Sequence, residues 1–414
     1  MRIGKDSYFH LAYCTKIHPA RNWQEQSEAL HTYIPALKNL LSPAQPFGLA
    51  LRLSEADSVQ LLEPALLEAL QDFLQRQDSY VFTINGFPFG SFYGEPVKAK
   101  IFAPDWQDEK RTQYTLRLIA ILRRLLPPGT EGSISTLPLS YKSWVPRVRE
   151  AKALERIVLN LLRIVEELVQ VRDEHGLDIH LDIEPEPDGL VENIPEFIHF
   201  YKEWLFTFGA PILAYRLKIK LSVALQYLQN HVQLCLDTCH LAVAYEDPAE
   251  AVELLAQEGI GIGKVQIASG LKVLFKGEDR RRKLFQCLGH FANSPYLHQV
   301  IGRQAKNISS RFSDLCQAMP HLDTCRDEEW RIHYHMPLFV RKYRMLQTTQ
   351  AETLQVLQLL KKQPFTRHLE IETYTWEQLP ADLKTPLHDS LWKEYRWVME
   401  ALERGKTAAI VPAS

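Results

Sequence analysis

Cysteine is scarce in this sequence, with 6 among 414 residues, and no two of them form a Cys-x-x-Cys pair. So sparse a set excludes a disulfide framework, and the missing pairs remove the usual sequence sign of structural zinc or redox chemistry. The sequence also lacks an apolar run of the roughly 18 to 20 residues that span a bilayer, and its beginning, MRIGKDSYFH, lacks the apolar core of a signal peptide. We therefore expect a cytoplasmic protein without a transmembrane segment.

An excess of charge of either sign is missing as well. Lys+Arg number 48 and Asp+Glu number 50, so the formal net charge is -2. Proteins that coat nucleic acid usually carry a basic excess, because neutralising phosphates supplies most of their non-specific affinity. Nucleic acid is therefore not favoured as a partner, whereas a hydrophobic content of 46% is ordinary for a folded globular protein.

Eight short β-rich runs alternate with longer stretches in which apolar residues recur every three or four positions. The runs are residues 8–14, 47–53, 80–86, 133–139, 178–184, 232–238, 264–269 and 368–373. The helical stretches include residues 57–75, 111–126, 151–174, 193–208, 247–258 and 349–361. Strand-helix alternation indicates a parallel sheet, and eight repeats predict an α/β protein whose sheet closes into a single (β/α)8 TIM barrel.

The alternative to a barrel is an open, doubly wound sheet, which usually has a Gly-rich turn after its first strand. Here the first strand runs into TKIHPARNW, which contains no glycine. We predict a barrel over residues 1–376, with residues 271–330 as an insertion near its mouth. A C-terminal helical appendage, with a helix over 387–402, and a loose tail are predicted for residues 377–414.

Polar residues follow the strands to their C-terminal ends. Because both faces of a barrel strand are covered, a charged residue on one needs a reason. Alternation places His180, Asp182 and Glu184 on one face of the fifth strand, and by the same count Asp237 and Glu372 point toward the barrel axis. Three carboxylates from three strands are thus predicted to converge at the C-terminal mouth, where barrel enzymes keep their chemistry.

Carboxylates so close together need protons or a cation among them. His240 comes three residues after Asp237, and His333 and His335 alternate within residues 330–339, which we predict to form an extra short strand. Carboxylate oxygens with imidazoles suit Mn²⁺, Mg²⁺, Co²⁺ or Zn²⁺. A divalent metal ion is therefore the predicted cofactor.

Each of these residues has a structural alternative. The carboxylates can form a buried ion-pair network with arginines such as Arg52 or Arg331. His240 can simply cap or pack at the start of its helix, and His333 and His335 can be bystanders.

The motifs Leu-Asp-Ile-Glu ending at Glu184, Leu-Asp-Thr-Cys-His ending at His240 and Ile-Glu-Thr around Glu372 resemble those of the xylose-isomerase-like TIM-barrel superfamily. That superfamily includes sugar phosphate isomerases and epimerases and the endonuclease IV type of apurinic-site nuclease. The resemblance implies that Glu184, Asp237 and Glu372 bind metal, and that His240 is a ligand or catalytic group. It also implies that Glu184 or Glu372 acts as the general acid or base that moves the substrate's proton, as in the epimerases.

Two further features follow from the same resemblance. His333-Tyr-His335 is similar to a nuclease-branch motif that supplies another metal ligand. Gln266 stands where superfamily members commonly place a metal-binding histidine, and its carbonyl would be a weaker, neutral ligand that suits hard cations better than zinc. A full three-zinc nuclease site is therefore not expected.

The phrases NGFPFGSF, APDW, STLPLSYK and ETYTWEQLP resemble a narrower group, the EboE-type metabolite-traffic proteins, whose genes lie in clusters linked to export of secondary-metabolite precursors. The resemblance covers nearly the whole chain. It implies a role in metabolite traffic or processing, with a small-molecule metabolite and other proteins of such a cluster as partners.

Four further residues are candidates for contact with substrate. Phe87 and Trp106 follow the third strand and are placed to form a wall against a ring substrate, although loop packing explains them nearly as well. His10 lies on the first strand and has a satisfied core polar residue as its alternative, and Asn85 lies on the third strand.

Three functions remain open on the sequence alone. The first is a metal-dependent isomerase or epimerase of a hydroxycarbonyl metabolite, acting through an enediolate. The second is a non-catalytic metabolite-binding component of an export pathway, which the glutamine at position 266 would suit. The third is a phosphoesterase of the endonuclease IV type. The substrate, the metal and the oligomeric state are not determined by the sequence.

Overall fold

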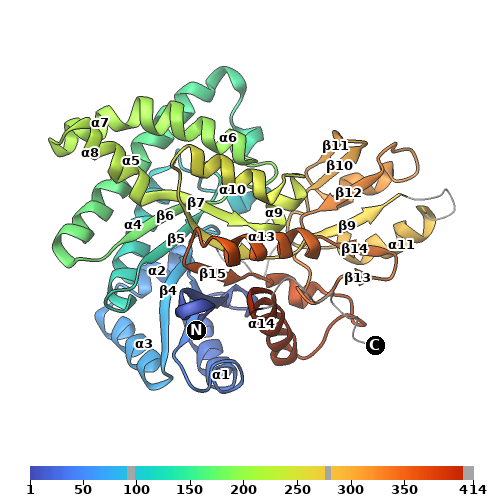
Figure 1. Cartoon of the computed structure of the whole chain (residues 1–414), viewed down its shortest axis with the longest axis horizontal. Helices are drawn as coiled ribbons and strands as arrows, with labels where there is room; N and C mark the ends of the chain where they lie inside the picture. Colours follow the sequence, from blue (N-terminus) through green and yellow to red (C-terminus); the bar gives the residue numbers. More distant parts are fainter. Residues whose placement is uncertain (91–97, 276–280, 404–414) are drawn as a thin grey trace.

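A closed barrel of eight parallel strands forms the body of the molecule in the computed structural model, which describes residues 1–90, 98–275 and 281–403 (Figure 1). Its strands are β2 (Phe9–Cys14), β3 (Phe47–Arg52), β4 (Ser79–Asn85), β5 (Gly132–Thr136), β6 (Ile179–Ile183), β7 (Val232–Asp237), β8 (Ile262–Ile267) and β15 (His368–Ile371). Neighbours in this order pair in parallel, and pairing of β15 with β2 and of β2 with β3 closes the ring. The predicted barrel and all eight predicted strand positions are confirmed. A short strand, β1 (Arg2–Ile3), adds to β2 in antiparallel fashion.

Helices follow the barrel strands and cover the barrel. They are α1 (Trp23–Leu41), α2 (Glu55–Gln60), α3 (Pro64–Arg76), α4 (Glu109–Leu125), α5 (Glu150–His175), α6 (Ile194–His199), α7 (Ala210–Leu217), α8 (Leu221–His231), α9 (Thr238–Val243), α10 (Pro248–Gln257) and α13 (Gln350–Lys362). The helical stretch predicted over 57–75 is divided. It is two helices, and Pro64 begins the second, because proline lacks the N–H that a helix interior needs but is tolerated in a first turn.

The helical stretch predicted over 193–208 is present and extends further than predicted. α6 continues into a π-helix over Phe200–Gly209 and then into α7. α1 was not among the predicted helices; it begins after Asn22, whose side chain accepts a hydrogen bond from the backbone N–H of Glu25.

A second sheet lies at the end of the barrel where β7 and β8 end (Figure 1). Its six strands are antiparallel in the order β11-β10-β12-β9-β14-β13. They are β9 (Leu271–Leu274), β10 (Val300–Gln304), β11 (Asn307–Phe312), β12 (Glu329–Ile332), β13 (Lys342–Tyr343) and β14 (Leu346–Thr348), and α11 (Arg281–Ala292) and α12 (Leu315–Ala318) accompany them. The residues predicted as an insertion, 271–330, supply most of this sheet, and residues up to Thr348 complete it.

The strand predicted over residues 330–339 is wrong in its extent. β12 ends at Ile332, so His333 and His335 lie beyond it and do not alternate on one face of a strand. The segment instead turns from the second sheet toward the barrel, where the backbone N–H of Met336 donates to the carbonyl of Ser269 at 2.7 Å.

The C-terminal helix α14 (Leu387–Glu403) is present where it was predicted and packs against α13 and α1. Its buried Glu394 accepts hydrogen bonds from Leu338 N at 3.1 Å and from Thr373 Oγ1 at 2.6 Å, which ties the helix to the segments that follow β12 and β15. The predicted tail falls largely on residues 404–414, outside the described residues. The division into 1–376 and 377–414 stays a prediction. Among the described residues, no helix combines the length and apolarity that crossing a membrane requires.

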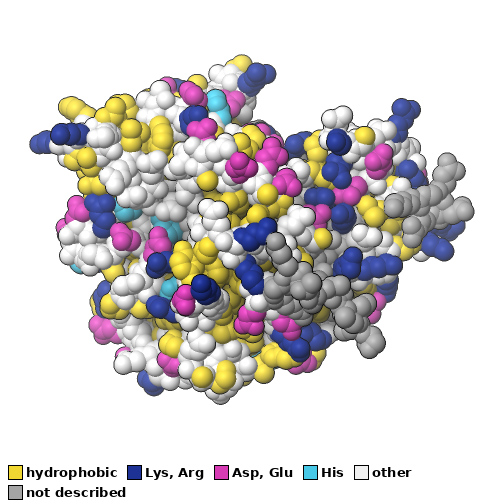
Figure 2. All heavy atoms as spheres, in the orientation of Figure 1, with side chains coloured by type: hydrophobic (Ala, Val, Ile, Leu, Met, Phe, Trp, Pro, Cys, Tyr) yellow, Lys and Arg dark blue, Asp and Glu magenta, His cyan; other side chains and the backbone are white. Residues whose placement is uncertain are grey.

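Basic and acidic side chains are interspersed over the face shown in Figure 2, in keeping with the balanced composition. The inside of the barrel, in contrast, is polar and buried. Lys264 donates to Glu370 Oε2 at 2.6 Å, and His180 Nδ1 lies 2.6 Å from Asp182 Oδ1. Gly263 makes room for the second pair, because a Cβ there would lie 2.1 Å from the Asp182 oxygen.

Candidate metal centre at the barrel mouth

Three carboxylates reach the mouth from strand ends, as the sequence predicted. Asp237 is the last residue of β7, and Glu184 and Glu372 directly follow the ends of β6 and β15. All three are at most 3% exposed. Asp237 also caps α9, since its Oδ1 accepts from the backbone N–H groups of Cys239 at 2.6 Å and His240 at 3.0 Å. The cap fixes the Asp237 side chain and leaves its Oδ2 facing the mouth.

Three buried histidines are oriented in the same way, each by a hydrogen bond from its Nδ1 to an oxygen. His240 Nδ1 lies 3.1 Å from the carbonyl oxygen of Pro185, and His335 Nδ1 lies 2.6 Å from that of Glu372. His333 Nδ1 lies 2.7 Å from Oε1 of Gln299, whose nitrogen donates to Pro187 O at 2.9 Å. Because a carbonyl oxygen only accepts, each Nδ1 carries the hydrogen, and each neutral ring keeps its Nε2 lone pair.

The neutral form of these rings is favoured by their surroundings. Burial, together with the neighbouring His335, lowers the pKa of His240 to about 3. Burial lowers the pKa of His335 to about 4, and burial and the two other imidazoles lower that of His333 well below its usual range. All three are therefore unprotonated at neutral pH, the state in which imidazole binds metal.

The Nε2 lone pairs point at one another. Nε2 of His240 and Nε2 of His333 are 3.0 Å apart, although neither has a hydrogen to offer the other. His335 Nε2 and Asp237 Oδ2 are 3.9 Å apart, and within the described part of the chain both are buried without a hydrogen-bond partner. Ligand atoms of His240, His333 and His335 lie within 4.8 Å of one another, as do those of Glu184, Asp237 and His240. Electron pairs gathered in this way fit a divalent cation with bonds of about 2.0–2.2 Å.

The segment Glu184-Pro185-Glu186-Pro187 organises this cluster. Its two prolines present the carbonyls that orient His240 and, through Gln299, His333. Its two glutamates are buried, with Glu184 Oε1 3.7 Å from His240 Nδ1 and Glu186 Oε2 3.8 Å from His240 Nε2. Burial, with the repulsion of neighbouring carboxylates, raises the pKa of both glutamates well above the usual range.

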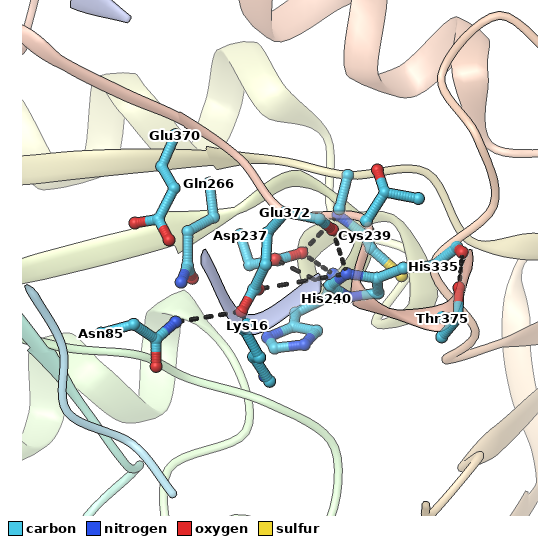
Figure 3. Close-up of polar contacts among 12 residues, drawn as sticks. Lys16, Asn85, Asp237, Cys239, His240, Gln266, His335, Glu370, Glu372 and Thr375 are labelled. Atoms are coloured by element: carbon cyan, nitrogen blue, oxygen red, sulfur yellow. Dashed lines mark hydrogen bonds and ion pairs between the residues drawn. The ribbon is translucent and has the colours of Figure 1, made fainter. Parts of the chain in front are cut away.

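Glu372 has a different environment from the other two carboxylates. Its Oε1 accepts from Lys16 Nζ at 3.1 Å and from Asn85 Nδ2 at 3.0 Å, and in Figure 3 Asn85 lies on one side of it and His335 on the other. Burial by itself raises the pKa of Glu372, but Lys16 and His335 lower it below its ordinary value overall. Burial and Glu372 in turn raise the pKa of Asp237 well above its own.

Gln266 also makes hydrogen bonds rather than offering a bare carbonyl. With its amide nitrogen toward Glu184, it donates to the two carboxylate oxygens at 2.9 and 3.0 Å and accepts from Asn85 Nδ2 at 3.1 Å. The metal-ligand roles all stay predictions, for Glu184, Asp237, His240, Gln266, His333, His335 and Glu372.

The other sequence-predicted residues are placed differently. Asn85 joins the cluster, whereas Phe87 and Trp106 are buried, with Phe87 packed edge-to-face on Phe102 and Trp106 Nε1 donating to Thr136 at 3.2 Å. The structure does not bring His10 to the mouth. It lies near the start of β2, at the other end of the barrel, 3.0 Å from the Tyr80 hydroxyl.

Sequence reasoning missed Lys16 and Gln299. Lys16 takes the counter-ion position beside Glu372, whereas the arginines considered for it bind elsewhere: Arg331 to Glu329 and Glu352, and Arg52 to the carbonyl of Gly90. The position of Lys16, two residues after the first strand at its C-terminal end, is a signal that could have found it. Nothing in the local sequence marks Gln299.

Binding of a divalent ion at this centre is expected to release protons and to tighten as the pH rises. The raised pKa values of Glu184 and Asp237 mean that these groups keep protons where ordinary carboxyls have lost them, and an ion must displace those protons. Each proton released makes the affinity rise up to about tenfold per pH unit. Calorimetric titration with Zn²⁺ in two buffers of different ionisation enthalpy measures the number released, and a buffer-independent heat would contradict this expectation.

No protein-family model and no curated protein matches the chain. Among solved structures, the chain is similar to a xylose isomerase-like TIM barrel protein from Mycobacterium smegmatis in complex with magnesium, with 12% identity, 95% of this chain and 98% of that chain covered, and a TM-score of 0.48. It is also similar to the probable 3-DHS dehydratase AsbF from Bacillus anthracis (11% identity, 93% and 97% covered, TM-score 0.44) and to a D-tagatose 3-epimerase-like protein (13% identity, 94% and 98% covered, TM-score 0.44). These neighbours are xylose-isomerase-like TIM-barrel proteins.

Proposed function

We propose that this protein is a metal-dependent isomerase or epimerase acting on a hydroxycarbonyl metabolite in the cytoplasm. The observation that carries the proposal is the convergence of three Nε2 lone pairs, from His240, His333 and His335, beside the carboxylates of Glu184 and Asp237. Neutral imidazoles and carboxylates together suit a transition-metal ion such as Zn²⁺, Co²⁺ or Mn²⁺.

A bound ion would supply electrophilic polarisation of a carbonyl and its neighbouring hydroxyl, which stabilises the enediolate form of the substrate. The proton is moved by the chain's own residues. Glu372, which Lys16 and Asn85 hold as a carboxylate, is placed to accept it, and Glu184, linked to Asn85 through Gln266, is placed to return it. Burial of these groups keeps bulk water from competing for the proton.

The sequence resemblance to EboE-type proteins supports a finer assignment to metabolite traffic, with the reaction serving a precursor that other proteins of an export cluster carry onward. A barrel that holds such a precursor without turning it over is the non-catalytic form of the same proposal. Loss of activity in Glu372→Gln together with retained binding of the metabolite separates the two forms.

The test is solvent-proton exchange into a panel of sugars and hydroxyketones by protein reloaded with Zn²⁺, Co²⁺ or Mn²⁺, followed in D₂O by NMR. We expect deuterium at the carbon next to the carbonyl of at least one compound. Glu372→Gln is expected to lower the rate by about 100-fold or more, since a positioned general base contributes about 10²- to 10⁴-fold. Trp144→Ala, an exposed change after β5, is the matched control. Metal-loaded protein that exchanges no compound and binds none would contradict the proposal.

A zinc phosphoesterase of the endonuclease IV type is the second candidate, because three imidazoles are ligands typical of Zn²⁺. Cleavage of a DNA duplex containing one abasic site, by protein loaded with Zn²⁺, would favour it over the isomerase. Its weakness is the balanced charge of the chain, which provides no basic excess for a phosphate backbone.

A further inference from the structure

Lys16 is a buried lysine inside an acidic site. It lies in a short 3-10 turn after β2, is 7% exposed, and places its ammonium 3.1 Å from Glu372 Oε1 and 4.0 Å from the centre of the Tyr374 ring. An ammonium in such a position loses hydration, and carboxylate and ring contacts must offset that loss. The position therefore indicates a specific electrostatic role.

The residues on the barrel side of the site form one continuous hydrogen-bonded chain. Lys16 and Asn85 donate to Glu372, Asn85 also donates to Gln266, and Gln266 donates to both oxygens of Glu184. Each carboxylate in this chain is thus matched by donors of the protein itself. The lone pairs of His240, His333 and His335 and Asp237 Oδ2, on the second-sheet side, have no such donors among the described residues.

We propose that Lys16 is a built-in cation that takes the place of a second divalent ion beside Glu372, so that the protein binds one ion, at the imidazole side of the mouth. This inference rests on the metal centre proposed above. It adds that the mouth has two sides, one that binds the ion and one that holds the Lys16 ammonium. Lys16 is a positioning residue: it acts through Glu372, which it holds as a carboxylate and keeps away from the ion. A substrate oxygen between the two sides would meet the ion on one side and the ammonium on the other.

The metal content of reloaded protein tests this division. Protein stripped with a chelator is reloaded with Zn²⁺ and Mn²⁺ together, desalted and measured by elemental mass spectrometry. We expect one ion per chain in the wild type and in Glu372→Gln. Lys16→Met, which keeps the length of the side chain and removes its charge, is expected to double the content by adding Mn²⁺, since the freed carboxylates and amides are oxygen ligands that suit Mn²⁺.

Two further variants separate a change of charge from a change of fold. Lys16→Arg keeps the charge and is expected to bind one ion, as the wild type does. The double variant Lys16→Met/Glu372→Gln is expected to lose the added Mn²⁺. Thermal unfolding followed by circular dichroism shows whether each variant folds, and Lys16→Gln replaces Lys16→Met if the latter does not.

Two results would overturn the inference: loss of the single wild-type ion in Glu372→Gln, or an unchanged content of one ion in Lys16→Met. A wild type that binds no ion would remove the proposed metal centre. In that case, uptake of one Mn²⁺ by Lys16→Met that Glu372→Gln abolishes would still support the role of Lys16, and no uptake would remove both.

Discussion

Replacement of Lys264 by methionine is expected to lower the free energy of unfolding by about 3–5 kcal/mol, the range seen when one partner of a buried ion pair is removed. Lys264 and Glu370 have fully buried side chains, and their charged atoms are 2.6 Å apart. The ammonium also donates to Ser135 Oγ at 2.9 Å and to Thr83 Oγ1 at 3.2 Å. Without it, the Glu370 carboxylate would be left in the barrel interior with no salt-bridge partner among the residues that the structure describes.

Urea unfolding followed by circular dichroism measures this loss. Lys202→Met is the matched control, because Lys202 pairs with Glu258 on the surface, where such a pair contributes about 0–1 kcal/mol. The double variant Lys264→Met/Glu370→Met is expected to recover much of the loss, since an apolar pair of similar volume often replaces a buried ion pair at little cost. A loss below about 1 kcal/mol in Lys264→Met would show that this ion pair does not hold the interior together.

Removal of the His335 imidazole is expected to weaken binding of Zn²⁺ or Co²⁺ by more than 100-fold. Losing a residue that only orients a ligand typically costs about 10- to 100-fold, whereas His335 Nε2, which has no hydrogen-bond partner among the described residues, is placed to bind the ion itself. Equilibrium dialysis of His335→Ala against a competing chelator measures the loss.

A graded series makes this result specific to the site. Gln299→Leu removes the acceptor that orients His333, and we expect it to weaken binding of the ion by about 10- to 100-fold. His321→Ala, an exposed histidine near the second sheet, is expected to bind as the wild type does. Equal losses for His335→Ala and His321→Ala would contradict the centre described above.

The proposed metal ligands come from two parts of the fold. Asp237 and His240 belong to the end of β7 and the helix after it, whereas His333 and His335 arrive from the end of β12 in the second sheet. An ion bound by both sets would therefore join the second sheet to the barrel mouth, and its binding is expected to raise the melting temperature of the protein.

Some of the site follows from local pattern. Side chains of a strand alternate between its two faces, so that Glu184, Asp237 and Glu372 could be assigned to the barrel axis from spacing alone. The eight strands were predictable for the same reason, since parallel strands buried on both faces read as short apolar runs between helical periods. The ends of helices were harder to predict, because the break before Pro64 depends on a single residue inside an otherwise continuous apolar period.

The remaining features depend on contacts between residues that are far apart in the chain. Lys16 meets Glu372 across 356 positions, and the hydrogen on His333 is fixed by Gln299, which lies 34 positions earlier, directly before β10 of the second sheet. A side chain's charge partner and a ring's tautomer are set by whichever groups the closed barrel places within about 3 Å, and local periodicity carries no information about them. The order of the strands and the carboxylates on the barrel axis can therefore be predicted from the sequence. The mouth is divided into an ammonium side and an imidazole side only when the barrel and the second sheet pack together.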